Sequence, residues 1–406
     1  MSELPRIGRG AFLIGAAAAS ASIAAHAPAA LAADSVDLPF ENGSRPLIAY
    51  PQKRPLILLT SRPVQLETPF GVFNEGVMTP NDAFFVRWHL AGVPTTIDVN
   101  TFRINVHGLV DSARQLSVAD LKTEFEPVEI AAVCQCSGNS RGFFSPRVPG
   151  GEWANGAMGN ALWKGARLRD VLTKAGVKDG AVQVRVNGAE TPVLSATPPF
   201  IKAIDIDLAM SPDVILAYSM NGADLPVLNG YPVRLVVPGY FATYWVKMLT
   251  NVEVIGEPDQ NFWMKTAYRI PADPCGCQKP GETVKTVPIN RLTVRSFVTN
   301  IRDGARVQAG KPLVVNGIAF DSGYGIEQVL FSNDGGQHWS PAALGKDYGP
   351  YSFRPWQARF TPHAGSYALA SLAMNTIGQA QRLDNPVWNA GGYLRNIVET
   401  IRVSAA

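Results

Sequence analysis

Two segments of this 406-residue sequence carry side chains whose types and spacing could bind or transform a small molecule. The first is IAAVCQCSGNSRGFF, residues 130–144, in which an apolar run ends at Cys136 and a small-residue loop leads to Arg141. A thiol at a strand end, with open backbone and a cation beside it, has room for a ligand and a neighbour that favours the thiolate. The residues alone leave three roles open for Cys136: nucleophile, soft-metal ligand or inert core side chain. A cysteine hydrolase would also need a histidine partner.

The second segment is TPNDAFFVRWHL, residues 79–90, where two kinds of side chain alternate. In an extended strand, successive side chains point to opposite faces. One face then holds Phe84, Val86 and Trp88, and the other holds Phe85, Arg87 and His89. A solvent-facing polar edge would usually mix charges with Ser and Thr, so we interpret the Arg–His pair as an anion site.

The remaining cysteines give weaker signals. We expect Cys134 to be a buried apolar side chain. Cys275 and Cys277 form a second Cys-x-Cys pair, but paired zinc ligands usually have two or more residues between them. Disulfides are allowed in an exported protein. Because a strand is too rigid to join Cys134 to Cys136, we expect any bridge to be long-range.

The elements that must position these residues follow from hydrophobic patterning. The segment RLRDVLTKAG, residues 167–176, predicts a helix whose inner face is Leu168, Val171, Leu172 and Ala175, with Gly176 ending it. YPVRLVVPGY, residues 231–240, predicts a buried strand bounded by prolines. The Pro- and Gly-rich stretch 271–290 predicts a linker or an extended crossing strand.

After this stretch the sequence predicts short strands only. They are RLTVRSFV, PLVVNGIAF, IEQVLFS, WQARFT, SYALASLAM and NIVETIRV, with NDGGQHW as a hairpin turn after the third. About six strands in this length suggest a β-sandwich of immunoglobulin type. The length of the whole chain predicts two domains, or three.

The composition argues against some kinds of binding partner, and the N-terminal segment predicts export. The net charge is only +3 and there is no run of Lys or Arg, which argues against nucleic acid and anionic membrane as partners. Residues 1–32 have the basic start, short apolar core and small-residue cleavage site of an export signal. We expect cleavage after about Ala32 and no membrane anchor, because the apolar core is too short to span a bilayer. Arg9 is followed by Gly10 rather than a second Arg, which leaves the twin-arginine route open.

Five motifs in order give a specific resemblance: TPNDAFFVRWH, CQCSGNSRGFF, WKGARLRDVL, NGYPVRLVVPGYFATYWVKML and FWMKTAYRIP. Together with the strand-rich tail they resemble the sulfite oxidase family of molybdenum enzymes, most closely the catalytic subunit of bacterial periplasmic sulfite dehydrogenases. The resemblance implies an α+β fold. Its parts would be a mixed molybdopterin-binding catalytic domain at 33–275, a linker at 276–290 and an immunoglobulin-like β-sandwich of the dimerisation type at 291–406.

The resemblance also implies roles for residues. Cys136 would be the one protein ligand to molybdenum, and a soft thiolate suits such a metal. Arg87, His89, Arg141 and Tyr268 would form the anion pocket and act in catalysis, with His89 making binding pH-dependent near neutrality. The cofactor contacts would be Phe85, Arg87, His89, Cys136, Asp170, Asn229, Arg234, Trp245, Val246 and Lys247. Asn229 and Trp245 stand where many relatives have histidine, so these two contacts depart from the family pattern. Asp170 could instead be a surface helix residue, and Arg234 a strand-end ion pair.

The implied activity is oxidation of sulfite to sulfate in the periplasm. Nothing in the sequence resembles a haem domain or a Cys-x-x-Cys-His site. We therefore expect no haem in this chain and a separate c-type cytochrome as electron acceptor, either soluble or a stable subunit, so that the protein is a homodimer or a heterodimer. The alternatives are another molybdenum oxidoreductase, such as a nitrate or sulfoxide reductase, and an exported immunoglobulin-like binding protein.

Overall fold

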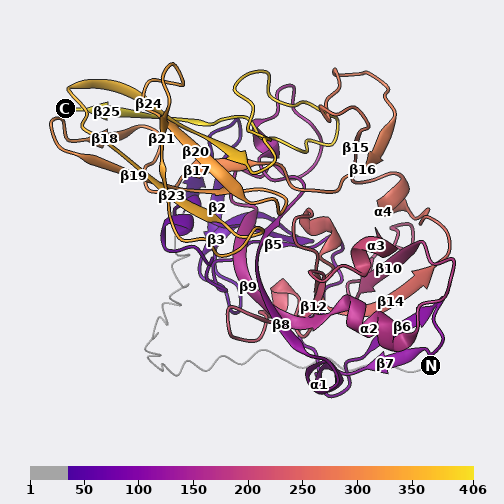
Figure 1. The fold of residues 1–406 in the computed structure, drawn as a ribbon. Helices are drawn as coiled ribbons and strands as arrows, with labels where there is room; N and C mark the ends of the chain where they lie inside the picture. Colours follow the sequence, from indigo (N-terminus) through magenta and orange to yellow (C-terminus); the bar gives the residue numbers. More distant parts are fainter. Residues whose placement is uncertain (1–34) are drawn as a thin grey trace, which may run out of the picture. The chain divides into compact units, whose positions relative to one another are not determined.

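The computed structural model describes residues 35–406, so the expected export signal lies outside the described residues. Strands predominate, and the α-helices are short (Figure 1). They are α1 (Val118–Thr123), α2 (Leu168–Ala175), α3 (Ile206–Ala209) and α4 (Phe262–Lys265), with the 3₁₀ helices η1 (Phe70–Asn74), η2 (Arg141–Phe143), η3 (Val227–Asn229) and η4 (Ala242–Tyr244). The predicted α+β class is therefore confirmed in part, because the fold is mostly β. Among residues 35–406, no helix is long and apolar enough to cross a membrane.

The first sheet runs in chain order and leads to the Arg–His segment. Its antiparallel strands are β1 (Ser35–Asp37), β2 (Ser44–Ile48), β3 (Leu56–Ser61), β4 (Val64–Glu67) and β5 (Val86–Arg87). The predicted alternating strand is thus only two residues long. Phe84 and Trp88 are nevertheless buried on either side of β5, so the segment is fixed by packing as much as by pairing.

Two further sheets are formed by strands between residues 104 and 255. One has the order β11-β10-β14-β6-β7, with β6 parallel to β14. The other has the order β13-β12-β9-β8 and is antiparallel. Their bounds are β6 (Ile104–Gly108), β7 (Arg114–Leu116), β8 (Pro127–Gln135), β9 (Met158–Arg167), β10 (Gln183–Gly188), β11 (Ile201–Asp205), β12 (Ile215–Met220), β13 (Arg234–Val236) and β14 (Leu249–Ile255).

Strand β8 shows why Cys136 lies where it does. The first four residues of β8 alternate between exposed and half-buried, and the last five are all buried. The strand therefore enters the core as it approaches its end at Gln135, and Cys136 is the first residue beyond it. The prediction that the strand ends at this cysteine is confirmed.

The helix predicted at 167–176 is also confirmed. In α2 the predicted inner face, Leu168, Val171, Leu172 and Ala175, is buried. Gly176 ends the helix in the left-handed conformation, with φ 74°, where glycine has no Cβ penalty.

The last part of the described chain contains two sheets. One has the order β17-β19-β23-β22 and the other β18-β25-β24-β20-β21. Their bounds are β17 (Arg295–Val298), β18 (Ala305–Val307), β19 (Leu313–Phe320), β20 (Ile326–Ser332), β21 (Ser340–Pro341), β22 (Ala343–Leu344), β23 (Arg354–Phe360), β24 (Gly365–Asn375) and β25 (Thr400–Ala405). Each of the six predicted strand segments overlaps one of these strands, and the predicted hairpin joins β20 to β21.

Two hydrophobic cores hold these strands. The smaller includes Val315, Val329 and Leu369 and lies within the C-terminal strands. The larger consists mainly of residues before 293 but also includes Phe297 and Phe320. The C-terminal strands thus share core contacts with the rest of the molecule.

The segment between these regions is more structured than a simple linker. Strand β15 (Arg269–Pro271) pairs with β16 (Thr286–Pro288), and a disulfide joins Cys275 to Cys277 in the loop between them. Our expectation that any bridge would be long-range is wrong. It rested on the rigidity of a strand, whereas here Gly276 has φ 62° and turns the backbone so that the two sulfurs meet.

Candidate active site

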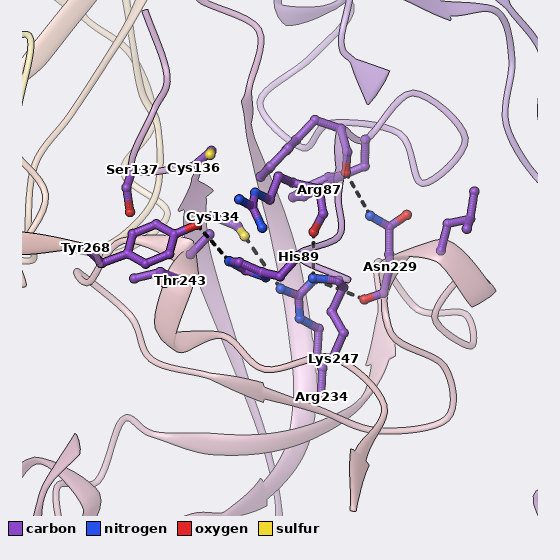
Figure 2. A pocket seen from close by; sticks show the side chains of 14 residues that line it. Arg87, His89, Cys134, Cys136, Ser137, Asn229, Arg234, Thr243, Lys247 and Tyr268 are labelled. Carbon is purple, nitrogen blue, oxygen red and sulfur yellow. Dashed lines mark hydrogen bonds between the residues drawn. The ribbon is translucent and has the colours of Figure 1, made fainter. Parts of the chain in front are cut away.

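A small pocket, partly open to solvent, brings together segments that are far apart in the sequence (Figure 2). Arg87 and His89 come from β5 and the residues after it. Cys136 and its neighbours come from the end of β8, and Tyr268 precedes β15. The complete lining is Phe84, Phe85, Arg87, His89, Cys134, Cys136, Ser137, Leu228, Asn229, Arg234, Ala242, Thr243, Lys247 and Tyr268.

The loop after Cys136 is held by the backbone of residues 154–157. The Cys136 N–H donates to the Ala157 carbonyl at 2.9 Å, and the Ser140 N–H donates to the Ala154 carbonyl at 2.6 Å. Ser140 adopts φ 70°, an uncommon left-handed conformation for a residue other than glycine. A Cβ at Gly138 would lie 2.6 Å from the Arg141 guanidinium, so a small residue is required there.

A buried carboxylate holds this backbone in turn. Glu67, the last residue of β4, accepts hydrogen bonds from Gly156 N at 2.7 Å and from Ala154 N at 3.0 Å. Burial raises the pKa of Glu67 to about 7, while these two backbone donors act in the opposite direction. Glu67 therefore positions the segment on which the Cys136 loop rests.

His89 is fixed on three sides. Its ring stacks on Phe200, with centroids 3.4 Å apart, and its Nε2 lies 2.8 Å from the Tyr268 hydroxyl. Glu190 accepts hydrogen bonds from His89 N at 3.0 Å and Leu90 N at 2.8 Å, and its Oε1 lies 3.7 Å from His89 Nδ1. The histidine thus presents one ring edge to Tyr268 and the other to a carboxylate.

The pKa of His89 lies well below its usual range. Burial is the largest cause, followed by the positive charges of Arg87, Lys247 and Lys202. Our expectation that His89 titrates near neutrality is therefore wrong, because its surroundings keep the imidazole neutral there. Burial lowers the pKa of Lys247 to about 8 and that of Lys202 to about 7, so these amines titrate in the range expected for the histidine.

Tyr268 occupies a constrained position. Its φ of 56° is rare for an aromatic residue, and Ile289 N donates to its carbonyl at 2.8 Å. Burial raises the pKa of the phenol, so the hydroxyl stays protonated. The Arg87 guanidinium lies 6.0 Å from the centre of the Tyr268 ring.

Arg141 stands beside the pocket rather than in its lining. Its Nε and Nη2 donate to the Gly391 carbonyl at 3.1 and 3.0 Å. Its guanidinium lies 5.1 Å from the ring centre of Tyr393, which stacks on Tyr268 at 5.9 Å. A loop from the C-terminal part of the chain therefore fixes the arginine next to the pocket.

The other predicted contacts differ in where the structure places them. Lys247 donates to the Arg87 carbonyl at 2.8 Å. Asn229 lines the pocket, but its amide is engaged, because Nδ2 donates to the Phe85 carbonyl at 3.0 Å and Oδ1 accepts a hydrogen bond from buried Lys53.

Arg234 is buried without a carboxylate partner among the described residues. It donates to the carbonyls of Asn229 and Trp245 at 3.0 and 3.1 Å, and its guanidinium lies 5.1 Å from the Trp163 ring centre. It also lies 3.8 Å from the Cys134 sulfur. Cys134 is thus buried as predicted, yet it contacts a polar group.

Three predicted cofactor contacts are not in the pocket lining. Trp245 and Val246 are buried behind it, and the Trp245 indole donates to the Tyr240 carbonyl at 3.0 Å. Asp170 lies in the first turn of α2, where its carboxylate pairs with Arg169 at 3.3 Å and Arg167 at 3.7 Å. The structure does not bring Asp170 to the site.

The pocket wall is chemically suited to a polar, anionic ligand. Five of its buried polar atoms have no hydrogen-bond partner among the described residues: Arg87 Nη1, His89 Nδ1, Ser137 Oγ, Arg234 Nε and Thr243 Oγ1. Buried polar groups in native proteins are nearly always paired, so such a cluster indicates a ligand. With a thiol at one end and cationic nitrogens along the wall, the donor set fits a sulfur-bound metal carrying a phosphorylated organic ligand.

Several residues of the site were not predicted. Glu67, Glu190, Phe200 and Lys202 act by long-range contacts, and a single sequence does not reveal such partners. Of these four residues, only Lys202 could have been singled out from the sequence, because it lies within the otherwise apolar segment FIKAI. A lysine on a buried strand usually has a specific role.

Comparisons with known proteins agree with this site. Residues 89–263 match the family described as oxidoreductase molybdopterin binding domain. Sulfite oxidase of Gallus gallus is 34% identical over 368 residues, which cover 86% of this chain and 78% of that protein. Mitochondrial sulfite oxidase of Mus musculus is 32% identical over 390 residues, which cover 90% and 68%. The crystal structure of the sulfane dehydrogenase SoxCD from Paracoccus pantotrophus has the same fold, with a TM-score of 0.72, 23% identity and 84% of each chain covered.

The fold and the site therefore define an oxidoreductase of the molybdopterin-binding class. Within that class, the identity and coverage of its relatives show that the chain belongs to the sulfite oxidase family.

Proposed function

We propose that this protein oxidises sulfite to sulfate at a molybdenum–molybdopterin centre and passes the electrons singly to a separate c-type cytochrome. One observation carries the proposal: the Cys136 thiol lines the same buried pocket as Arg87, His89 and Tyr268. The names of the relatives support sulfite as the substrate.

The pocket residues divide into two groups in this proposal. Cys136 would be the protein ligand of the metal, and Arg234, Lys247, Ser137 and Thr243 would bind the polar and anionic parts of the cofactor. When bound, the cofactor supplies oxygen-atom transfer and two-electron redox chemistry.

The second group binds the substrate. Arg87 gives charge-assisted hydrogen bonds to a small oxyanion. The Tyr268 phenol stays protonated, so its O–H can donate a hydrogen bond to the anion, and its oxygen lies 2.8 Å from His89 Nε2. Arg141 adds positive charge from beside the pocket. Because His89 is neutral, its role is to orient Tyr268 rather than to bind the anion by charge.

Larger-scale features belong to the same proposal. We assign residues 33–275 to the catalytic domain, 276–290 to a connection and 291–406 to an immunoglobulin-like sandwich. The protein would be exported to the periplasm after cleavage near Ala32. It would form a homodimer or bind a cytochrome subunit in place of the second copy.

The deciding experiment is sulfite-dependent reduction of a c-type cytochrome by the purified, molybdenum-loaded protein. We expect activity in the wild type and a loss of more than about 100-fold in Cys136→Ser, beyond what the loss of an outer-shell contact costs. Cys134→Ser is the matched control. It removes the neighbouring thiol, keeps Cys136, and should lose much less activity.

The outcomes separate the parts of the proposal. A fully loaded protein that does not oxidise sulfite would contradict the substrate, and sulfoxides would be tested next. A Cys136→Ser variant that keeps both molybdenum and activity would contradict the metal ligand. Sulfite oxidation with an artificial acceptor but without cytochrome reduction would contradict only the acceptor.

A further inference from the structure

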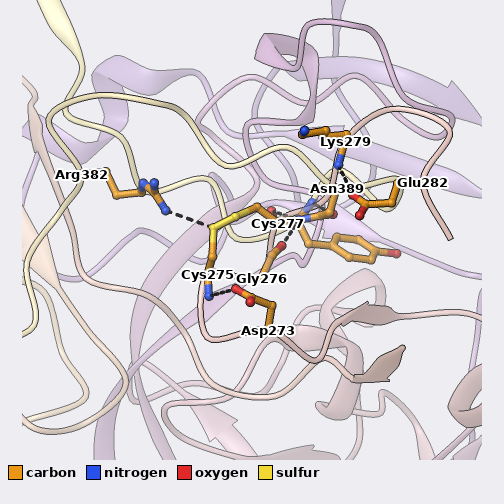
Figure 3. The surroundings of a disulfide bond; sticks show 9 residues. Asp273, Cys275, Gly276, Cys277, Lys279, Glu282, Arg382 and Asn389 are labelled. Carbon is orange, nitrogen blue, oxygen red and sulfur yellow. Dashed lines mark hydrogen bonds between the residues drawn. A yellow bond between two sulfur atoms is a disulfide. The ribbon is translucent and has the colours of Figure 1, made fainter. Parts of the chain in front are cut away.

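The Cys275–Cys277 disulfide has no part in the proposed reaction, yet it lies only a few residues after Tyr268 in the sequence. Figure 3 shows the side chains around it. Both cysteines are half-buried rather than fully buried, so solvent reaches part of each residue. One residue separates them. Because the stabilisation that a disulfide gives falls as the closed loop shortens, a ring this small contributes little to global stability. Partly exposed disulfides are typically the labile ones.

Two charged groups flank the bond and make it asymmetric. Arg382 Nη1 lies 3.4 Å from the Cys275 sulfur. The Asp273 carboxylate accepts a hydrogen bond from Cys275 N at 2.8 Å, and one of its oxygens lies within 4.8 Å of both sulfurs. The guanidinium favours negative charge on Cys275, whereas the carboxylate opposes the approach of an anion.

We propose that this disulfide is a covalent acceptor site for sulfite. The sulfur lone pair of sulfite attacks the Cys277 sulfur and forms a new S–S bond. The Cys275–Cys277 bond breaks, and its electron pair leaves on Cys275 as a thiolate beside Arg382. The products are an S-sulfonate on Cys277 and a thiolate on Cys275, so no other oxidant or reductant is needed. The inference rests on the proposed function only in taking sulfite as the anion that this protein meets.

The reaction is reversible at this site. Since a single residue joins the two cysteines, the Cys275 thiolate stays next to the S-sulfonate after the ring opens. Its attack on the Cys277 sulfur expels sulfite and restores the disulfide. The modified fraction therefore follows the sulfite concentration, as in a sensor.

A chain of contacts links the ring to the active site. The Gly276 carbonyl accepts a hydrogen bond from buried Asn389 Nδ2 at 3.0 Å, and the same Nδ2 donates to the Tyr393 carbonyl at 2.9 Å. Tyr393 N donates back to Asn389 Oδ1 at 3.1 Å. This loop supplies the Gly391 carbonyl that holds Arg141. Opening the ring frees Gly276 and so loosens the loop that positions Arg141.

The test uses the full-length holoenzyme with sodium sulfite and no electron acceptor, so that the anion is not consumed by turnover. After alkylation of free thiols, peptide mass mapping should find one added SO₃ group on Cys277 and an alkyl group on Cys275. No S-sulfonate on Cys277 at sulfite concentrations that saturate the wild type's oxidation rate would overturn the proposal. An S-sulfonate on Cys275 instead would overturn the assigned direction of attack.

A pair of variants tests the electrostatic argument. Arg382→Gln should slow S-sulfonation about fivefold, because the leaving thiolate loses its cation. Asp273→Asn should speed it about threefold, because the repulsive carboxylate is removed. A change that only disturbed the loop would move both rates in the same direction, and that result would contradict the mechanism.

Hydrogen exchange tests the link to Arg141 without any activity assay. Sulfite should increase amide exchange across residues 388–394 in the wild type but not in Cys275→Ser/Cys277→Ser, whose ring is already open. Complete S-sulfonation with unchanged exchange would overturn the coupling. S-sulfonation by a protein that does not oxidise sulfite would contradict the proposed function and leave this inference standing.

Discussion

His89 shows how strongly surroundings decide what a residue does. Histidine usually titrates near neutrality, but this one is buried among three cationic side chains that hold its pKa down. The same burial brings the pKa of Lys202 to about 7 and that of Lys247 to about 8. The pH dependence of this protein near neutrality should therefore come from buried amines and from the buried Glu67 carboxyl rather than from His89.

The lowered pKa of Lys202 can be tested by measuring how the free energy of unfolding depends on pH. Its amine would titrate near 10.5 in the unfolded chain but near 7 in the fold. Between these values the unfolded state binds more protons, so stability increases as pH increases, by about 1.4 kcal/mol per pH unit. Below pH 7 both states are protonated and the cost of burying the charge is constant. We expect Lys202→Met to lower the slope of stability against pH by this amount between pH 7 and 10, as measured by urea unfolding, while buried Lys247 keeps its own contribution.

The exposed Lys164 on β9 is the matched control for this measurement. Lys164→Met should leave the slope unchanged, because its amine is solvated in both states. Equal slopes in wild type and Lys202→Met would show that the buried amine keeps its ordinary pKa.

At the scale of elements, the spacing of residues correctly predicted the features that are determined by neighbours in the sequence. The inner face of α2, its glycine end and the strand end at Cys136 follow from residue spacing, and each is found. The partners of these elements could not be predicted, because contacts such as Glu67 to residues 154–156 join segments that are nearly 90 residues apart. Asp170 was predicted as a cofactor contact from its motif, and it lies outside the pocket lining because its helix turns the carboxylate towards neighbouring arginines.

Glu67 tests the importance of one such long-range contact. In Glu67→Gln, one of the two acceptor oxygens becomes an NH₂ group that faces a backbone N–H. Leaving a buried donor unpaired costs about 1–3 kcal/mol, so we expect the free energy of unfolding to fall by that amount in urea titrations. Because the Cys136 loop rests on this segment, molybdenum content should fall as well.

Glu75→Gln provides the comparison, since Glu75 is exposed and forms an ion pair with Arg54. Such a surface pair is worth less than about 1 kcal/mol. If both variants lose equal stability, Glu67 has no special role in supporting the loop.

For the whole molecule, a buried charge cluster connects the C-terminal strands to the Cys136 loop. Arg295 of β17 is fully buried, donates to Ser140 Oγ at 2.8 Å and pairs with Glu399 at 3.0 Å. Glu399 in turn accepts a hydrogen bond from Asn155 at 2.5 Å. The C-terminal strands and the residues that position Cys136 therefore share one network, beside the apolar contacts of the larger core.

The two ends of the Arg295–Glu399 pair should respond differently to substitution. Glu399 keeps about a fifth of its side chain exposed, whereas Arg295 has none. Glu399→Gln leaves a guanidinium buried without its counter-charge, which costs about 3–5 kcal/mol. Arg295→Met leaves a carboxylate that water can reach, so its cost should be nearer about 1–2 kcal/mol. The double variant should be no less stable than Glu399→Gln, because the buried Arg295 guanidinium is gone, whereas Arg395, 3.7 Å from Glu399, loses its partner in both variants. Urea unfolding of the four proteins measures this cycle, and additive losses would show that the two charges do not act as a pair.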